Sequence, residues 1–208
     1  MVHRVPVTPR ALLTAWGGLA GCLLLTGCGG HPHPAEQAGE ATGRPTGGAT
    51  VTSEATFAAY SPGAHAVSYD PRLVPPGSTG KVVLTRDAAR TQITLELTGL
   101  VPDRTYGAHL HANRCGPDPK AAGPHYQHSP DPATSGTSTD PRFANPRNEV
   151  WLDFTSDARG AGRAQSTQDW VAGQRAPRSL VIHAARTQTA PGSAGQAGPR
   201  LACLDLAE

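Results

Sequence analysis

The sequence predicts an all-β fold, an eight-stranded Greek-key β-sandwich or barrel with two long functional loops. Short runs rich in β-branched residues recur along the chain, and several alternate apolar with polar residues, as half-buried strands do. Gly, Pro and Asp separate these runs, and no stretch has the periodicity of a long amphipathic helix. The expected strands lie at residues 66–70, 81–87, 91–100, 105–112, 149–155, 162–170, 179–185 and 200–206.

The connections between these strands include one short hairpin turn and two long loops. Residues 87–90 are expected to form the turn of a hairpin between the second and third strands. Two other connections are long: residues 115–148, which are rich in Pro, Gly, Ser and Asp, and residues 186–198. Loops of this length in a compact domain are usually functional, so we expect the site to lie among them.

The first 27 residues have the pattern of an export signal. Two arginines and no acid precede an apolar run that is too short and too rich in Gly for a membrane span. The run ends in LTGC, which resembles a bacterial lipoprotein signal and predicts lipid attachment at Cys28. Cys22, in LAGC, is the alternative lipid site, and an ordinary cleaved signal is the alternative to both.

The remaining chain is predicted to have two parts. Residues 28–52 show no apolar periodicity and are expected to be a flexible tether, followed by a folded domain at residues 53–208. With lipid at Cys28, the domain would lie outside the cytoplasm, anchored to the outer face of the cell membrane in a bacterial envelope. The lipid would be its only contact with the membrane.

Charge and cysteine content narrow the classes of function. The chain has 18 basic and 16 acidic residues, and removal of residues 1–27 takes away two arginines and leaves 16 of each. A near-neutral domain has no general attraction to nucleic acid, so no nucleic-acid partner is expected. Two cysteines remain after the signal region, Cys115 and Cys203, and an exported domain favours a disulfide over two soft metal ligands.

Four histidines have the arrangement of a metal site. His109 and His111 are separated by one residue on an expected strand, so both side chains point to the same face about 6.6 Å apart. His125 lies in the first long loop, and His183 ends the apolar strand SLVIH. Imidazole nitrogens without thiolates favour Cu(II) or Zn(II), and four nitrogens in a tetragonal arrangement favour copper.

Three blocks of the sequence resemble the copper/zinc superoxide dismutase family, in the order that the family has them. YGAHLHANRC is similar to the strand with two copper ligands that leads to a disulfide cysteine. AGPHYQH is similar to the segment with the histidine that bridges copper and zinc. SLVIHAA followed by GQAGPRLAC is similar to the segments with the last copper ligand, the active-site arginine and the second disulfide cysteine.

The resemblance covers about residues 66–206 and implies a function. It implies that copper is the cofactor, that superoxide is the substrate, and that dioxygen and hydrogen peroxide are the products. Arg200 would attract and orient the anion, His125 would also carry a proton, and Cys115 would form a disulfide with Cys203. The implied copper ligands are His109, His111, His125 and His183.

The zinc side departs from the family pattern, which predicts a copper-only member. The family has two more histidines and an aspartate after its bridging histidine, whereas the only later histidine in the first loop here is His128, a weak candidate for zinc. Asp131, Asp140, Glu149 or Asp153 would have to supply the carboxylate, and none of them stands at the family position. The aspartate that the family has after its last copper ligand is also missing, and Thr187 lies near its place. Either Glu149 or Asp153 is expected to hold the far ring nitrogen of His125 in place of zinc.

A copper-binding protein without catalysis is the alternative function. An envelope lipoprotein that sequesters copper on the same scaffold would need the four histidines but would have no use for Arg200 beside them. The arginine therefore favours the enzyme, an oxidoreductase that serves antioxidant defence. The sequence predicts no particular oligomeric state.

Overall fold

The computed structural model describes residues 48–172 and 175–207. The predicted signal peptide, Cys22, Cys28 and the tether up to residue 47 lie outside the described residues. Within the described part of the chain, no helix is both long enough and apolar enough to cross a membrane.

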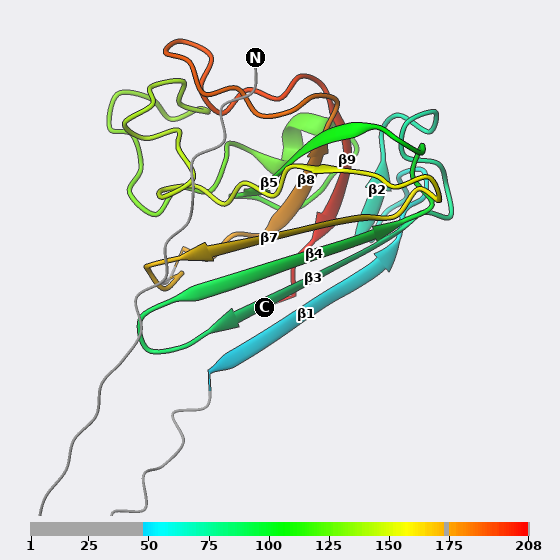
Figure 1. The fold of residues 1–208 in the computed structure, drawn as a ribbon, viewed down its shortest axis with the longest axis horizontal. Helices are drawn as coiled ribbons and strands as arrows, with labels where there is room; N and C mark the ends of the chain where they lie inside the picture. Colours follow the sequence, from blue (N-terminus) through cyan, green and yellow to red (C-terminus); the bar gives the residue numbers. More distant parts are fainter. Residues whose placement is uncertain (1–47, 173–174, 208) are drawn as a thin grey trace, which may run out of the picture. The chain divides into compact units, whose positions relative to one another are not determined.

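Two antiparallel sheets make up the described domain, as Figure 1 shows. The four-stranded sheet has the order β1 (Ala49–Thr56), β3 (Thr79–Arg86), β4 (Thr91–Thr98) and β7 (Gly162–Gln168). The five-stranded sheet has the order β2 (Ala66–Ser68), β9 (Arg200–Asp205), β8 (Ser179–His183), β5 (Thr105–His111) and β6 (Phe154–Thr155). The predicted all-β Greek-key sandwich is confirmed, with nine strands among the described residues in place of eight.

Alternating side chains place the core between the two sheets. Buried and exposed residues alternate strictly along β4, so one face of its sheet is apolar and the other is solvated. The predicted hairpin turn joins β3 to β4, where the Asp87 carboxylate accepts hydrogen bonds from the backbone N–H groups of Ala89 and Arg90. Both sheets contribute to one core, with Val82, Leu84, Ile93 and Leu95 from the first and Tyr106, Leu110, Leu180 and Ile182 from the second.

The first strand was not among those expected from the sequence. β1 begins at Ala49, so residues 49–52 belong to the sheet and not to the predicted tether. Its sequence, ATVTSEAT, has one large apolar residue, Val51, and most of its side chains are exposed or half-buried. The strand is held at the sheet edge by its backbone pairing with β3, which an apolar pattern does not reveal.

The expected strand at residues 149–155 is also shorter than predicted. Only Phe154–Thr155 pairs as a strand, while Glu149 and Trp151 form isolated bridges with Gln127 and His109. Each of the other seven expected segments contains a strand of the described domain. The irregular backbone before β6 leaves the Glu149 and Asp153 side chains to form hydrogen bonds with the loops.

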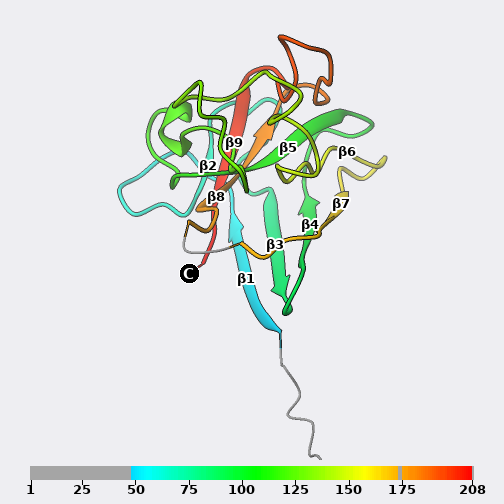
Figure 2. The same cartoon turned by 90° about the vertical axis from the view of Figure 1, so that its left-hand side faces the viewer.

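Both long connections lie on the side of the five-stranded sheet. The first runs from the end of β5 to β6 and holds a short 3₁₀ helix, Pro119–Ala122; the second joins β8 to β9. In Figure 2 the two loops gather near β5, β8 and β9 and away from the lower ends of β1 and β3. The loops and the sheet face beneath them hold the groups from which the site is built.

Candidate metal centre

The five-stranded sheet presents histidines on the face opposite the core. Along β5, Leu110 packs into the core between the sheets, so His109 and His111 point to the other face. The His-x-His spacing therefore places both rings on one face, as predicted. Both side chains are fully buried, because the long loops cover this part of the sheet.

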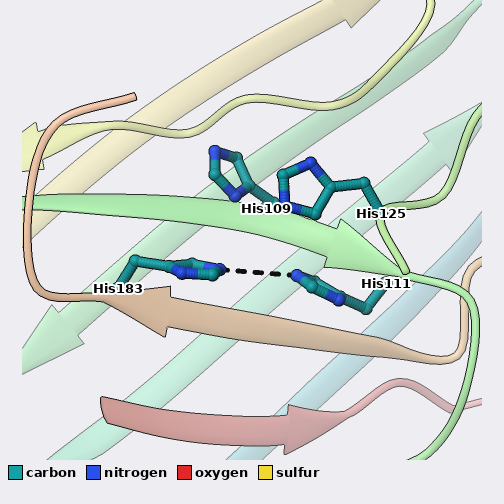
Figure 3. Close-up of side chains that lie close together, drawn as sticks. All are labelled: His109, His111, His125 and His183. Carbon is teal, nitrogen blue, oxygen red and sulfur yellow. Dashed lines mark hydrogen bonds between the residues drawn. The ribbon is translucent and has the colours of Figure 1, made fainter. Parts of the chain in front are cut away.

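The fold brings the two other predicted ligands to the same place. His183 ends β8, opposite Gly107 on β5, and His125 forms a backbone bridge with His111 from the first long loop. The four candidate ligand atoms of His109, His111, His125 and His183 all lie within 4.8 Å of one another, and all four residues are buried. Figure 3 shows the four rings converging from β5, β8 and the loop.

One nitrogen of each ring is engaged by the protein. Nδ1 of His111 donates to the Gly123 carbonyl at 3.0 Å, and Nδ1 of His183 donates to the Gly198 carbonyl at 3.2 Å. Nδ1 of His125 lies 2.8 Å from the Glu149 carboxylate, and Nε2 of His109 lies 2.7 Å from the Thr187 hydroxyl. Hydrogen bonds to the distal nitrogen are the usual way in which proteins orient histidine ligands.

The remaining ring nitrogens fit a bound cation. Because Nδ1 is the donor in both His111 and His183, each ring has its lone pair on Nε2. These two Nε2 atoms lie only 3.4 Å apart, as the dashed line in Figure 3 marks, so two lone pairs face each other. Nδ1 of His109 is buried and has no hydrogen-bond partner. A buried polar atom without a partner is costly, so these lone pairs are suited to a metal that accepts nitrogen ligands.

Burial favours the neutral form of three of the four histidines. It lowers the pKa of His109 and of His111 well below the ordinary value, and it lowers the pKa of His183 to about 3. A second proton in the cluster would meet repulsion from an already protonated neighbouring ring and from Arg200, which lowers the three pKa values further. Neutral imidazole is the form that binds metal, so these three rings need no deprotonation at neutral pH.

Glu149 is the carboxylate that holds His125. It is fully buried, and one of its oxygens lies 2.8 Å from both the His125 ring and the Trp151 indole N–H. The other oxygen accepts a hydrogen bond of 2.8 Å from the Gln127 amide. Of the two candidates from the sequence, Asp153 makes no hydrogen bond with His125 and instead accepts two from Thr187.

Arg200 lies beside the histidines at the start of β9. It is half-buried, and its guanidinium donates to the carbonyls of Pro119 and Gly123 at 2.9 and 2.7 Å. The Gly123 carbonyl also accepts the hydrogen bond from His111, so the arginine and a candidate ligand share one anchor. The predicted disulfide between Cys115 and Cys203 is present and ties the first long loop to β9.

His128 and two loop aspartates do not join the cluster. The His128 ring stacks on Trp170 with the ring centroids 4.8 Å apart, and no group of candidate ligands among the described residues includes it. Asp131 accepts a hydrogen bond from the Ser138 hydroxyl, and Asp140 pairs with Arg142.

Two residues near the histidines were not assigned a role from the sequence. Trp151 donates to Glu149, and its ring centroid lies 6.1 Å from that of His109. The sequence places Thr187 near the position of an absent aspartate, and in the structure its hydroxyl contacts both His109 and Asp153. The replacement of an aspartate by Thr187 in HAART is visible in the sequence. Its hydrogen-bond partners are not, because they depend on how the loop folds.

The fold and site define a class: a β-sandwich that buries four histidines beneath two long loops. The sequence profile of the copper/zinc superoxide dismutase (SODC) family matches residues 78–204, and the chain belongs to this family. Its structure is similar to that of the Cu/Zn superoxide dismutase from Brucella abortus, with a TM-score of 0.50 and 20% identity over 77% of this chain and 99% of that one. A double mutant of a SOD-like protein from Bacillus subtilis matches with a TM-score of 0.44 and 18% identity over 62% and 89% of the two chains.

Proposed function

We propose that the protein is a copper-dependent superoxide dismutase whose metal is held by His109, His111, His125 and His183. The observation that carries the proposal is the hydrogen bonding of the cluster, in which each ring has one nitrogen engaged and one left for a ligand. Copper bound there would supply the one-electron exchange by which two superoxide anions and two protons become dioxygen and hydrogen peroxide.

We propose further that copper acts without zinc. Zinc bridging through His125 would need its Nδ1, and that nitrogen already contacts the buried Glu149 carboxylate. Three hydrogen bonds hold the Glu149 carboxylate, which favours its staying on His125 over its displacement by zinc. In this proposal Glu149 holds the His125 ring in place, a role that zinc has in two-metal members of the family.

Two residues of the chain would act on the substrate. Arg200 carries a positive charge beside the cluster and has N–H groups beyond the two that anchor it, which suits it to attract and orient a small anion. His125 has Nε2 on the side away from Glu149, so a proton taken up at that atom can pass to the peroxide that forms.

The proposal is tested by the second-order rate of superoxide decay, measured by pulse radiolysis on the full chain loaded with copper alone. We expect a rate near the diffusion ceiling, about 10⁸–10⁹ M⁻¹s⁻¹. Adding zinc should leave that rate unchanged, and a rate that rises only with zinc would contradict the copper-only proposal. No catalysis with copper shown to be bound would favour the alternative, an envelope protein that binds copper without turning over superoxide.

Replacement of Arg200 by Ala should lower the rate about tenfold at low salt and flatten its dependence on ionic strength, because attraction of an anion is a screened electrostatic effect. Arg200→Lys, which keeps the charge but loses the planar fork, should retain part of the rate and most of the salt dependence. Arg163→Ala is the matched control, since this exposed arginine lies on β7 of the other sheet. A full rate in Arg200→Ala would refute the role of Arg200.

We also propose export and lipid anchoring through Cys28. The support is the signal pattern of residues 1–27 together with the Cys115–Cys203 disulfide, since structural disulfides are typical of oxidising compartments. A dismutase outside the cytoplasm would remove superoxide that arises at the cell envelope.

A further inference from the structure

A threonine and an aspartate lie behind His109 and connect three segments of the chain. His109 is on β5, Asp153 directly precedes β6, and Thr187 is in the loop between β8 and β9. Nε2 of His109 lies 2.7 Å from the Thr187 hydroxyl oxygen, which in turn lies 2.5 Å from Oδ1 of Asp153. The other oxygen of Asp153 accepts the backbone N–H of Thr187 at 2.9 Å.

The direction of each hydrogen bond follows from the chemistry of these groups. An ionised carboxylate only accepts, so the Thr187 hydroxyl must donate its single proton to Asp153. The hydroxyl oxygen can then only accept from His109, which requires the proton of the imidazole to be on Nε2. A neutral ring with its proton on Nε2 has its lone pair on Nδ1, the atom that is buried without a partner.

We propose that Thr187 and Asp153 are positioning residues that fix the proton of His109 on Nε2 and thereby make Nδ1 its metal-binding atom. This inference rests on the proposed metal site. His109 differs here from the three other histidines, whose Nδ1 atoms are held by Gly123, Gly198 and Glu149 and whose Nε2 atoms are left for the metal.

Close packing around the pair keeps it in place. A side-chain carbon on Gly107 would lie 2.5 Å from the Ala185 carbonyl, 2.7 Å from Cβ of Ala197 and 3.5 Å from the Asp153 carboxylate. A glycine at this position lets the second loop approach β5 closely enough for Thr187 to reach His109. Thr187 is itself buried, so water does not replace its hydroxyl easily.

The ring protons can be read directly in the metal-free full chain. Two-bond ¹H–¹⁵N NMR correlations show which nitrogen of a histidine is protonated, and a His109→Gln variant assigns the His109 signals. We expect Nε2–H for His109 and Nδ1–H for His111 and His183. Nδ1–H for His109 in the metal-free chain would overturn the proposal.

Asp153→Asn makes a sharper prediction because it reverses the direction of the hydrogen bonds. The amide oxygen can accept the Thr187 backbone N–H, while the amide N–H₂ donates to the hydroxyl oxygen, which then donates to Nε2 of His109. The His109 proton should therefore move to Nδ1. Thr187→Ser should keep the pattern of the native chain, and an Asp153→Asn spectrum identical to the native one would contradict the proposal.

Copper affinity provides the second measurement, by competition with a chelator of known affinity. Loss of a group that orients a histidine ligand typically costs 10–100-fold in metal affinity. We expect losses in this range for Asp153→Asn and Thr187→Val, with Thr187→Ser close to the native value. Thr91→Val is the matched control, since Thr91 is also buried and hydrogen-bonded but bonds to Trp170 and Ala172.

The two measurements separate the failure of this inference from the failure of the proposed function. A native affinity in both Asp153→Asn and Thr187→Val would refute the positioning role, whatever the enzymatic rate. If copper binds and the His109 proton moves as expected while superoxide is not consumed, the positioning role stands and the dismutase proposal fails.

Discussion

Acidifying the metal-free protein from pH 7 to pH 5.5 should lower its free energy of unfolding by about 3–4 kcal/mol. The cause is the cluster of buried histidines, since burial lowers the pKa values of His109, His111 and His183 in the folded chain. In the unfolded chain each of these histidines has a pKa near 6.5.

The sign follows from proton counting. Each folded-state pKa lies below its unfolded value, so between about pH 6.5 and the folded pKa, about 3 for His183, the unfolded chain binds more protons. Stability is therefore complete above about pH 6.5 and falls as the pH falls. Each histidine contributes about 1.4 kcal/mol per pH unit within the window, and the range down to pH 5.5 stays above the reference carboxyl pKa values of about 4.

Urea unfolding at a series of pH values measures the effect. Copper-loaded protein is the companion measurement: it should be more stable at every pH, yet its stability should fall at least as steeply with pH, because the unfolded chain takes up the same protons once the metal is released. A change of less than about 1 kcal/mol in the metal-free protein would mean that burial does not hold His109, His111 and His183 neutral.

The sequence could predict the fold and the histidine cluster because both depend on short-range patterns. Alternation along β4 and the apolar runs of β5 and β8 indicate strands, and the i, i+2 spacing of His109 and His111 places both rings on one face. His125 and His183 were candidates by residue type and position alone, and the family resemblance made them copper ligands, since no periodicity relates a loop residue to the end of a strand.

The sequence could not predict contacts that depend on how irregular backbone folds. Glu149 and Asp153 share a face only if residues 149–155 form a regular strand, and they do not, so one holds His125 and the other holds Thr187. The edge strand β1 was missed for a different reason. It is polar, and backbone pairing with β3 holds it in the sheet.

The four histidines are thus held by two kinds of partner. Backbone carbonyls of the loops orient His111 and His183, and carboxylates orient His125 directly and His109 through Thr187. Both carboxylates come from the short segment just before β6. Two carboxyl groups from one segment therefore stand behind the histidine cluster, an arrangement that favours a cation at its centre.

Removal of the Glu149 carboxylate should destabilise the metal-free protein by about 3–5 kcal/mol. In Glu149→Ala, the N–H groups of His125, Gln127 and Trp151 lose their common acceptor in a place from which water is largely excluded. A buried donor left without a partner costs about 1–3 kcal/mol, and three donors are affected. Thermal and urea unfolding of the metal-free chain measure the loss.

Glu54→Ala is the matched control, because Glu54 is an exposed carboxylate whose nearest cation, Lys81, is 3.8 Å away, and such a pair contributes little. Glu149→Gln keeps one acceptor oxygen and should fall between the native chain and Glu149→Ala. Since His125 loses its anchor, copper affinity should also fall about 10–100-fold in Glu149→Ala. Native stability and native copper affinity in this variant would show that the His125 ring is held by packing alone and that the carboxylate does not stand in for zinc.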